Sequence, residues 1–300
     1  MMALSTVWGM KQGARTAAEL LAPILRMGLE AVELDFRITP ELLEELLPSL
    51  RNGAPRAVSL HNFCPVPDPL PPYKASGDAF NLASLDAGER KEAVRWTCRT
   101  LEMAHELEVK AVVLHLGYME MDDELKPHEA FREGRWGQEE LERYLALRAS
   151  RAPRHLDAIL LCLEPILKRA ESLGVEVGIE NRYHLHEFPL GEEIGRILEE
   201  FSGAPIGYWH DVGHAHVLET LGAVKHRELL ERYCQRIVGV HLHDADGLKD
   251  HLPPGKGSID FDMVRDLLPE GVVKVMEIHP PATKGEIIEG LEFLKQKGIL

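Results

Sequence analysis

The chain has 300 residues, of which 45% are hydrophobic and 28% are charged, the composition of a soluble globular protein. Lys and Arg together number 34 and Asp and Glu number 49, so the formal net charge is −15, which argues against nucleic acid as a partner. No apolar run is long enough for a membrane span, and the N-terminus lacks the basic and apolar regions of a secretion signal, so we expect neither.

Eight short apolar runs predict β-strands. They are nearly continuous in apolar character and often β-branched, which is typical of strands covered on both faces. The predicted strands are Ala3–Val7, Ala31–Phe36, Ala57–His61, Ala111–Leu116, Val175–Glu180, Ile206–Asp211, Ile237–His243 and Lys274–Ile278.

Helical patterns lie between these runs. Thr39 and Pro40 predict a helix start before Glu41–Leu50, and Asp86 with Glu89 resembles a capping box. His155–Leu173 is a long amphipathic pattern. Further helices are predicted at Glu192–Phe201, Val224–Cys234, Asp260–Leu268 and Gly285–Lys297.

Alternation of strands and helices predicts parallel strands joined by right-handed crossovers. Eight such units match the size of a single (β/α)₈ TIM barrel over residues 1–300. An open doubly wound sheet is the alternative, but no glycine-rich phosphate turn follows an early strand.

Two segments are longer than ordinary loops. Residues 63–85 are rich in proline, and residues 118–154 are highly charged and partly helical at Gln138–Arg148. Both follow strands, so both would overhang the C-terminal mouth of a barrel as lids or substrate walls. The alternative for the second is a solvated insertion or a contact between subunits of a homo-oligomer.

Acidic and imidazole side chains stand at or just beyond the ends of six predicted strands. They are His61, His115, Glu180, Asp211, His214, His241, His243, His251 and Glu277. A TIM barrel brings such ends together at one face. The four cysteines are widely spaced and form no Cys-x-x-Cys pair, which argues against thiolate ligands and favours a cytoplasmic location. Imidazole and carboxylate without thiolate suit a divalent metal such as Mn²⁺, Mg²⁺, Co²⁺ or Zn²⁺.

Each of these residues also has a structural interpretation. A histidine at a strand end is more often hydrogen-bonded than functional, and a buried glutamate is commonly part of a structural ion pair. The convergence of all of them is harder to explain in this way.

Several motifs together resemble the xylose-isomerase-like barrels, a superfamily of sugar and sugar phosphate isomerases and epimerases and of endonuclease IV type (family 2) AP endonucleases. The motifs are Ile179-Glu180-Asn181, Asp211-Val212-Gly213-His214, His241-Leu242-His243-Asp244, His251 with Gly255-Lys256-Gly257, and Met276-Glu277. The likeness runs from the second strand to the eighth.

The resemblance to the epimerase branch implies one metal ion held by Glu180, Asp211, Glu277 and a histidine of the seventh strand. That histidine is His243, or His241 if the alignment shifts by two. Glu180 and Glu277 would also be the catalytic groups that move protons, and His214 would contact the substrate.

The endonuclease branch has three metal ions, and His61, His115, His214 and His251 also have counterparts in it. Two departures argue against that activity. Lys249 stands where that branch has an aspartate, with Asp250 beside it, and the loops carry acidic runs such as residues 120–124.

We therefore expect a metal-dependent isomerase or epimerase acting on a small sugar or sugar phosphate by enediolate proton transfer. A multinuclear phosphodiesterase and a non-catalytic, metal-dependent sugar-binding barrel are the alternatives. His61, His115 and His251 would line the sugar pocket or bind further metal ions. Trp8 is a candidate wall for the sugar ring, and Lys256 a candidate phosphate contact.

Overall fold

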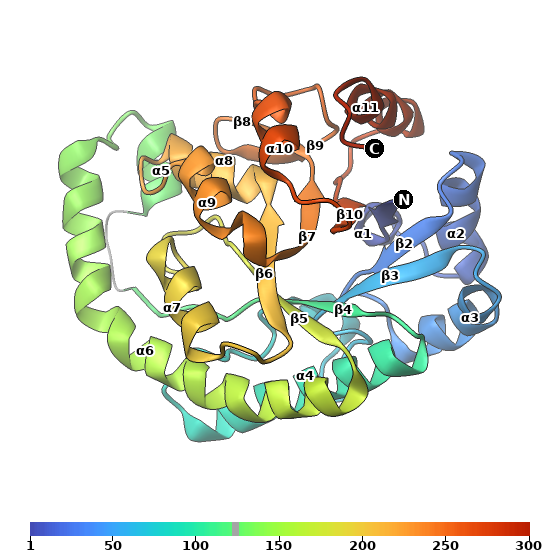
Figure 1. Ribbon diagram of the computed structural model, residues 1–300, viewed down its shortest axis with the longest axis horizontal. Coiled ribbons are helices and arrows are strands. Elements are labelled where there is room, and N and C mark those ends of the chain that lie inside the picture. The colour runs from blue at the N-terminus through green and yellow to red at the C-terminus, as the bar shows by residue number, and fades with distance from the viewer. Residues whose placement is uncertain (122–125) are drawn as a thin grey trace.

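The computed structural model describes residues 1–121 and 126–300, and it confirms the predicted (β/α)₈ barrel (Figure 1). Eight parallel strands close in the order β1-β10-β7-β6-β5-β4-β3-β2. Their bounds are β1 (Met2–Ser5), β2 (Ala31–Leu34), β3 (Arg56–His61), β4 (Ala111–Leu114), β5 (Glu176–Glu180), β6 (Ile206–Asp211), β7 (Ile237–Leu242) and β10 (Val273–Met276). The first strand is shorter than predicted, because Val7 already begins a helix.

The inside of the barrel is filled by side chains rather than hollow. Trp209 on β6 is fully buried and packs there with Ala3, Val113 and Val275. Gly178 on the neighbouring strand leaves room for the indole, because a Cβ atom at that position would lie 2.9 Å from Trp209 Cε3. The polar groups described below therefore lie above a closed apolar floor.

Helices surround the strands. They are α1 (Val7–Lys11), α2 (Ala17–Arg26), α3 (Pro40–Arg51), α4 (Ala87–Glu106), α5 (Pro127–Arg132), α6 (Gln138–Leu173), α7 (Glu192–Glu200), α8 (Val212–Thr220), α9 (His226–Tyr233), α10 (Phe261–Leu267) and α11 (Lys284–Gln296). The predicted start signals are present: the Thr39 side chain accepts a hydrogen bond from the Leu42 N–H, and the Asp86 side chain from the Glu89 N–H.

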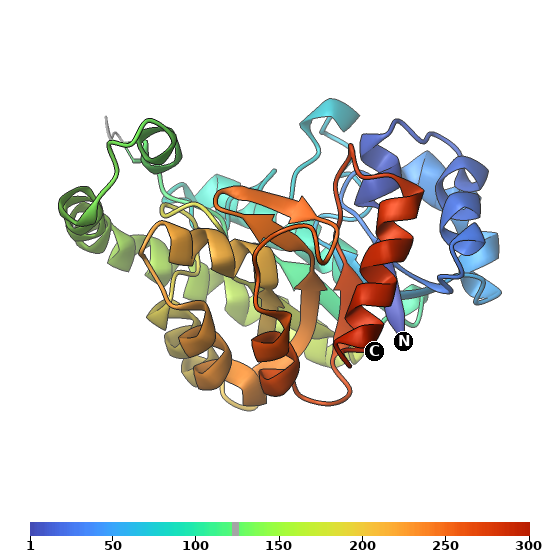
Figure 2. The same cartoon turned by 90° about the horizontal axis from the view of Figure 1, so that it is seen from above.

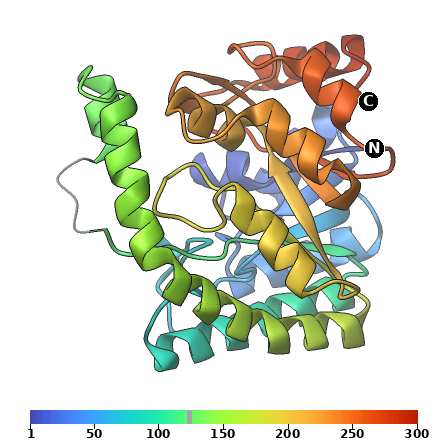
Figure 3. The same cartoon turned by 60° about the vertical axis from the view of Figure 1, so that its left-hand side comes forward.

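Helix α6 differs most from the expectation. The two helical stretches predicted at Gln138–Arg148 and His155–Leu173 form one helix of 36 residues, with Pro153 and Pro165 inside it. Figure 3 shows the helix bending around the barrel, which fits the hydrogen bonds that proline removes from a helix. The segment predicted as an insertion at 118–154 is therefore partly a barrel helix, and its acidic run at 120–124 lies in part outside the described residues.

A two-stranded antiparallel hairpin, β8 (Asp244–Asp246) with β9 (Lys249–Leu252), follows β7 and was not predicted. The proline-rich segment 63–85 holds the short 3₁₀ helix η1 (Pro72–Lys74). In the view of Figure 2, the hairpin, η1 and α5 all lie toward the same edge of the barrel, the edge at which the strands end. None of the described helices is long and apolar enough to cross a membrane.

Candidate active site

Four buried side chains from four strands converge at the C-terminal mouth of the barrel. Glu180 ends β5, Asp211 ends β6, His241 lies in β7, and Glu277 directly follows β10. One ligand atom of each lies within 4.8 Å of the others, and no more than 5% of any of these residues is exposed. His241 Nδ1 is 2.9 Å from Glu180 Oε1 and 3.2 Å from Glu277 Oε2. We call these four residues the central cluster.

Three buried carboxylates in one place need positive charge, because an unpaired buried carboxylate is very costly. Burial raises the pKa of Glu180, but hydrogen bonds and charge from the surrounding histidines, first of all His115 and His241, have the opposite and larger combined effect. The pKa of Glu180 therefore lies well below the usual range. Burial also raises the pKa of Glu277, but the charges of His241 and His251 together with a hydrogen bond from His251 lower it well below the usual range. Burial opposes the charged form of His241, yet Glu33 and Glu277 raise its pKa well above the usual value. The imidazolium of His241 thus faces the three carboxylates of the central cluster and also that of Glu33.

Glu33 on β2 holds His241 from the other side of its ring. Both carboxylate oxygens of Glu33 lie 3.1 Å from His241 Nε2, and Ser59 Oγ donates to Glu33 Oε2 at 2.8 Å. Both Glu33 and His241 have 0% exposure. A buried carboxylate on Nε2 keeps the proton on that nitrogen, so Nδ1 is the atom that would give up its proton and bind a cation, as is usual behind metal-bound histidines.

A second group shares Glu180 with the central cluster. His61 at the end of β3 and His115 just after β4 place their Nε2 atoms 3.6 Å and 2.8 Å from Glu180 Oε2. Arg182 also contacts this second group. Its Nη1 is 2.7 Å from His115 Nε2 and 3.7 Å from Glu180 Oε2. Burial and Arg182 act to lower the pKa of His115, but Asp78 at 2.9 Å and Glu180 raise it to about 9.

A third group shares Asp211 with the central cluster, and we call it the hairpin group because its His251 lies on the β8–β9 hairpin. It consists of Asp211, His214, His243 and His251. His243 Nε2 is 2.9 Å from Asp211 Oδ1, and its Nδ1 accepts a hydrogen bond from the His251 N–H. Asp250 stands beside this group, with Oδ1 3.1 Å from His251 Nδ1, whereas Lys249 is exposed. Asp250, rather than Lys249, therefore contacts the histidines of this group.

The structure thus brings together most of the residues predicted from the sequence. His241, rather than His243, lies among Glu180, Asp211 and Glu277, while His243 joins the hairpin group. Trp8 is buried, and its indole Nε1 donates to the Ala282 carbonyl at 2.8 Å. Lys256 pairs with Glu289 at the surface, 2.7 Å apart. The roles of Trp8 and Lys256 as substrate contacts remain predictions.

Sequence reasoning assigned no role to Glu33, Asp78 or Arg182. Glu33 and Arg182 carried a weak signal, since each is a charged residue in or next to an apolar strand. Asp78 carried none, because it lies inside the proline-rich segment and reaches the mouth only through the path of that loop.

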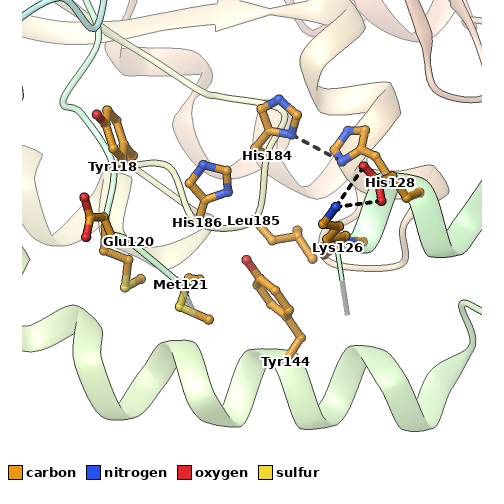
Figure 4. A pocket seen from close by; sticks show the side chains of 12 residues that line it. Tyr118, Glu120, Met121, Lys126, His128, Tyr144, His184, Leu185 and His186 are labelled. Carbon is orange, nitrogen blue, oxygen red and sulfur yellow. Dashed lines mark hydrogen bonds and ion pairs between the residues drawn. The ribbon is translucent and has the colours of Figure 1, made fainter. Parts of the chain in front are cut away.

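A cavity of about 580 Å³ is lined by residues 118–121, residues 126–129, Tyr144 of α6 and residues 184–186 after β5 (Figure 4). His128 and His184 face each other in it, with their Nδ1 atoms 3.2 Å apart. Tyr183 stacks on both His184 and His214, with ring centres 4.2 Å and 4.8 Å away. The Tyr183 ring therefore separates His184 in the cavity wall from His214 of the hairpin group.

The central cluster fits a divalent metal ion. Metal–oxygen and metal–nitrogen bonds of about 2.0–2.2 Å place neighbouring ligand atoms roughly 3 to 4 Å apart, and the four ligand atoms lie within 4.8 Å of one another. Three carboxylates and one imidazole suit Mn²⁺, Mg²⁺, Co²⁺ or Zn²⁺. The buried His214 Nε2 has no hydrogen-bond partner among the described residues, and Asp250 Oδ2 lies 3.9 Å from it, so this nitrogen is available to a bound molecule.

The profile of the xylose isomerase-like TIM barrel family matches residues 21–297, so the chain belongs to that family. An uncharacterized protein from Methanocaldococcus jannaschii is 27% identical over 229 residues, which cover 73% of this chain and 69% of the relative. Two solved structures share the fold. A D-tagatose 3-epimerase-like protein has 22% identity and a TM-score of 0.70, with 99% of this chain and 97% of the other covered. The IolI protein with a bound zinc atom has 16% identity and a TM-score of 0.67, with 99% and 96% covered.

Proposed function

We propose that this protein is a divalent-metal-dependent isomerase or epimerase of a small sugar or sugar derivative. The observation that carries the proposal is the central cluster, in which two glutamates and an aspartate are buried around His241 at the mouth of the barrel. The family name and the epimerase-like neighbour support the choice of a sugar as substrate.

Glu180, Asp211, His241 and Glu277 would hold the metal ion. A bound divalent cation would polarise the sugar carbonyl and stabilise the negative charge that develops when the neighbouring carbon loses its proton. The zinc atom in the IolI structure supports metal binding by this fold, and the identity of the native metal is open to experiment.

Glu180 and Glu277 would move the proton. They come from β5 and β10, which β6 and β7 separate in the barrel, so the two carboxylates reach the substrate position from different strands. One of them removes the proton from the carbon next to the carbonyl. The other returns a proton to the opposite face, which gives an epimer, or to the neighbouring carbon, which gives an isomer.

Hydrogen exchange with solvent tests this proposal directly. The protein loaded with Mn²⁺ is incubated with D-tagatose, D-fructose or D-psicose in D₂O, and deuterium next to the carbonyl is measured by mass spectrometry or NMR. Glu180→Gln and Glu277→Gln should each slow incorporation at least about 100-fold. The matched control is Glu231→Gln, an exposed residue on α9. Equal incorporation by the wild type and both active-site variants would refute the assignment of these glutamates.

A multinuclear hydrolase is the second candidate, because Glu180 and Asp211 each belong to two metal-capable groups. Arg182 argues against it: a fixed guanidinium 2.7 Å from His115 Nε2 opposes a second divalent ion between His61, His115 and Glu180. Metal content separates the two candidates. One ion per chain supports the isomerase, whereas two or three ions per chain support the hydrolase.

A further inference from the structure

A second cavity, of about 490 Å³, lies at the mouth beside the ends of β1, β2 and β3. Its lining comes from the segment at 10–15, the start of α3 and the η1 turn. Three cationic side chains, Lys11, Arg15 and Arg37, line it, and none of the described residues that line it is acidic. These three cations contrast with the net charge of −15 of the chain as a whole. We call it the cationic cavity.

Two of these side chains are not in contact with a carboxylate of the described residues. In the parts of the chain that the structure describes, neither Lys11 nor Arg15 forms an ion pair, and both are exposed. Lys11 Nζ is 2.9 Å from His279 Nδ1, an imidazole rather than an acid. The nearby Glu19 is bound to backbone N–H groups, including that of Arg15 at 2.9 Å. Arg37 differs, because it pairs with the buried Asp35 at 2.8 Å.

The cationic cavity is connected to the central cluster by direct contacts. The His279 ring, which contacts Lys11, stacks on His251 with ring centres 3.7 Å apart. His251 Nε2 in turn is 3.6 Å from Glu277 Oε2. Partial burial and then repulsion from the Arg37 charge lower the pKa of Lys11, against the opposite effect of the carboxylates of Glu277, Asp35 and Asp250. An anion between them would relieve this repulsion.

We propose that the cationic cavity binds the anionic end group of the substrate, so that the sugar that reacts at the central cluster carries a phosphate or a carboxylate. This inference rests on the proposed function and narrows its substrate class. Lys11 and Arg15 supply charge-assisted hydrogen bonds from side chains that form no ion pair among the described residues, and Arg37, whose charge is balanced by Asp35, offers its remaining N–H groups from a fixed position. The neighbouring Thr39 and Tyr73 complete the wall.

The cationic cavity is a better anion site than the one suggested by the sequence. Lys256, between two glycines, forms an ion pair with Glu289 and lies on the surface. Its charge is already neutralised, whereas the charges of Lys11 and Arg15 are free to meet a ligand.

Three ligands that differ only at one end of the sugar test the proposal: D-fructose 6-phosphate, D-fructuronate and D-fructose. Their binding to the metal-loaded protein is measured by calorimetry at constant ionic strength. Charge-assisted contacts in a partly exposed cavity should give at least one of the two anions about tenfold tighter binding than D-fructose. Whichever of the two anions binds better identifies phosphate or carboxylate as the preferred group.

Variants then locate the contact. Lys11→Gln and Arg15→Gln should each reduce the preference for the anion about three- to tenfold, and the double variant should abolish it. Lys168→Gln on α6 makes the same charge change at a distant exposed position and serves as the matched control. Both cavity side chains are exposed, so the variants should fold, and thermal unfolding verifies this.

Equal binding of all three ligands, or an anion preference that survives the double variant, would overturn the assignment of this cavity. The binding measurement does not depend on turnover. If the anion preference is lost in the double variant but no sugar exchanges deuterium, the cavity assignment stands and the isomerase proposal fails. If exchange occurs but D-fructose binds as tightly as both anions, the isomerase proposal stands and the cavity assignment fails.

Discussion

Replacing Glu33 by Gln tests whether His241 is a metal ligand. Gln keeps the shape of the side chain but removes its negative charge. Its carbonyl oxygen can still accept from His241 Nε2, 3.1 Å away, and its amide can still face Ser59 Oγ, 2.8 Å away. The change therefore isolates the effect of the charge behind the imidazole.

The expected effect is large for a residue that does not touch the metal. Both side chains are completely buried, so solvent does not screen the contact. Loss of a carboxylate behind a metal-bound histidine typically weakens metal binding about 10- to 100-fold, or about 1.4 to 2.8 kcal/mol. Competition between the protein and a chromogenic chelator for Zn²⁺ measures this directly. Ser59→Ala, which keeps the charge and removes only the hydroxyl, should cost about tenfold or less.

An unchanged affinity in Glu33→Gln would refute the reasoning, because His241 Nε2 would then have no role in presenting Nδ1 to a cation. A direct comparison completes the test. His241→Gln should reduce the affinity for the first metal ion more than His243→Gln does, since only His241 lies in the central cluster. A larger loss of affinity in His243→Gln than in His241→Gln would instead identify His243 as the ligand.

Two further predictions concern the group around His115. Arg182→Gln removes the fixed cation beside His115 and Glu180, so we expect the number of Zn²⁺ ions bound per chain to rise. Elemental analysis measures this number, and an unchanged number would show that Arg182 does not limit metal binding. The pKa of His115 is raised to about 9 in the metal-free protein, so its ion pair with Asp78 stabilises the fold fully below about pH 6.5 and is lost as the pH rises toward 9. The melting temperature of the metal-free protein should fall over that range, and it should fall less in His115→Gln; equal slopes would contradict this.

The sequence predicts the fold well because its signals are local. Continuous apolar strands, helix caps such as Asp86 and regular alternation are each readable without knowledge of contacts. The strand-end rule then selects most of the acidic and imidazole groups of the site. What could not be read is set by long-range geometry: the course of the loop that carries Asp78, the merging of two predicted helices into α6, and the pairing of Lys256 with Glu289.

The choice between His241 and His243 shows this limit most clearly. Residues two apart on a strand point to the same side, so both imidazoles face the mouth, and local sequence cannot separate them. The register of β7 against β6 decides between them. Tyr208 pairs with Ile237, but Trp209 pairs with Gly239, so β7 carries one extra residue, Val238. Beyond this bulge Asp211 stands opposite His241. With regular pairing Asp211 would stand opposite Val240, and the side chains of Asp211 and His241 would no longer be in register at the mouth.

Gly207 makes room for this bulge, which gives a final prediction. A Cβ atom at Gly207 would lie 2.8 Å from the Arg236 carbonyl oxygen and would also overlap the Val238 side chain. Gly207→Ala should therefore destabilise the protein by about 1 to 3 kcal/mol, as overpacking does, and should also weaken metal binding, because the bulge sets His241 opposite Asp211. Gly285→Ala on α11, where the nearest atom is 3.8 Å away, is the matched control and should leave both quantities nearly unchanged. If Gly207→Ala loses stability but binds Zn²⁺ with wild-type affinity, then the bulge supports the barrel without positioning the metal ligands.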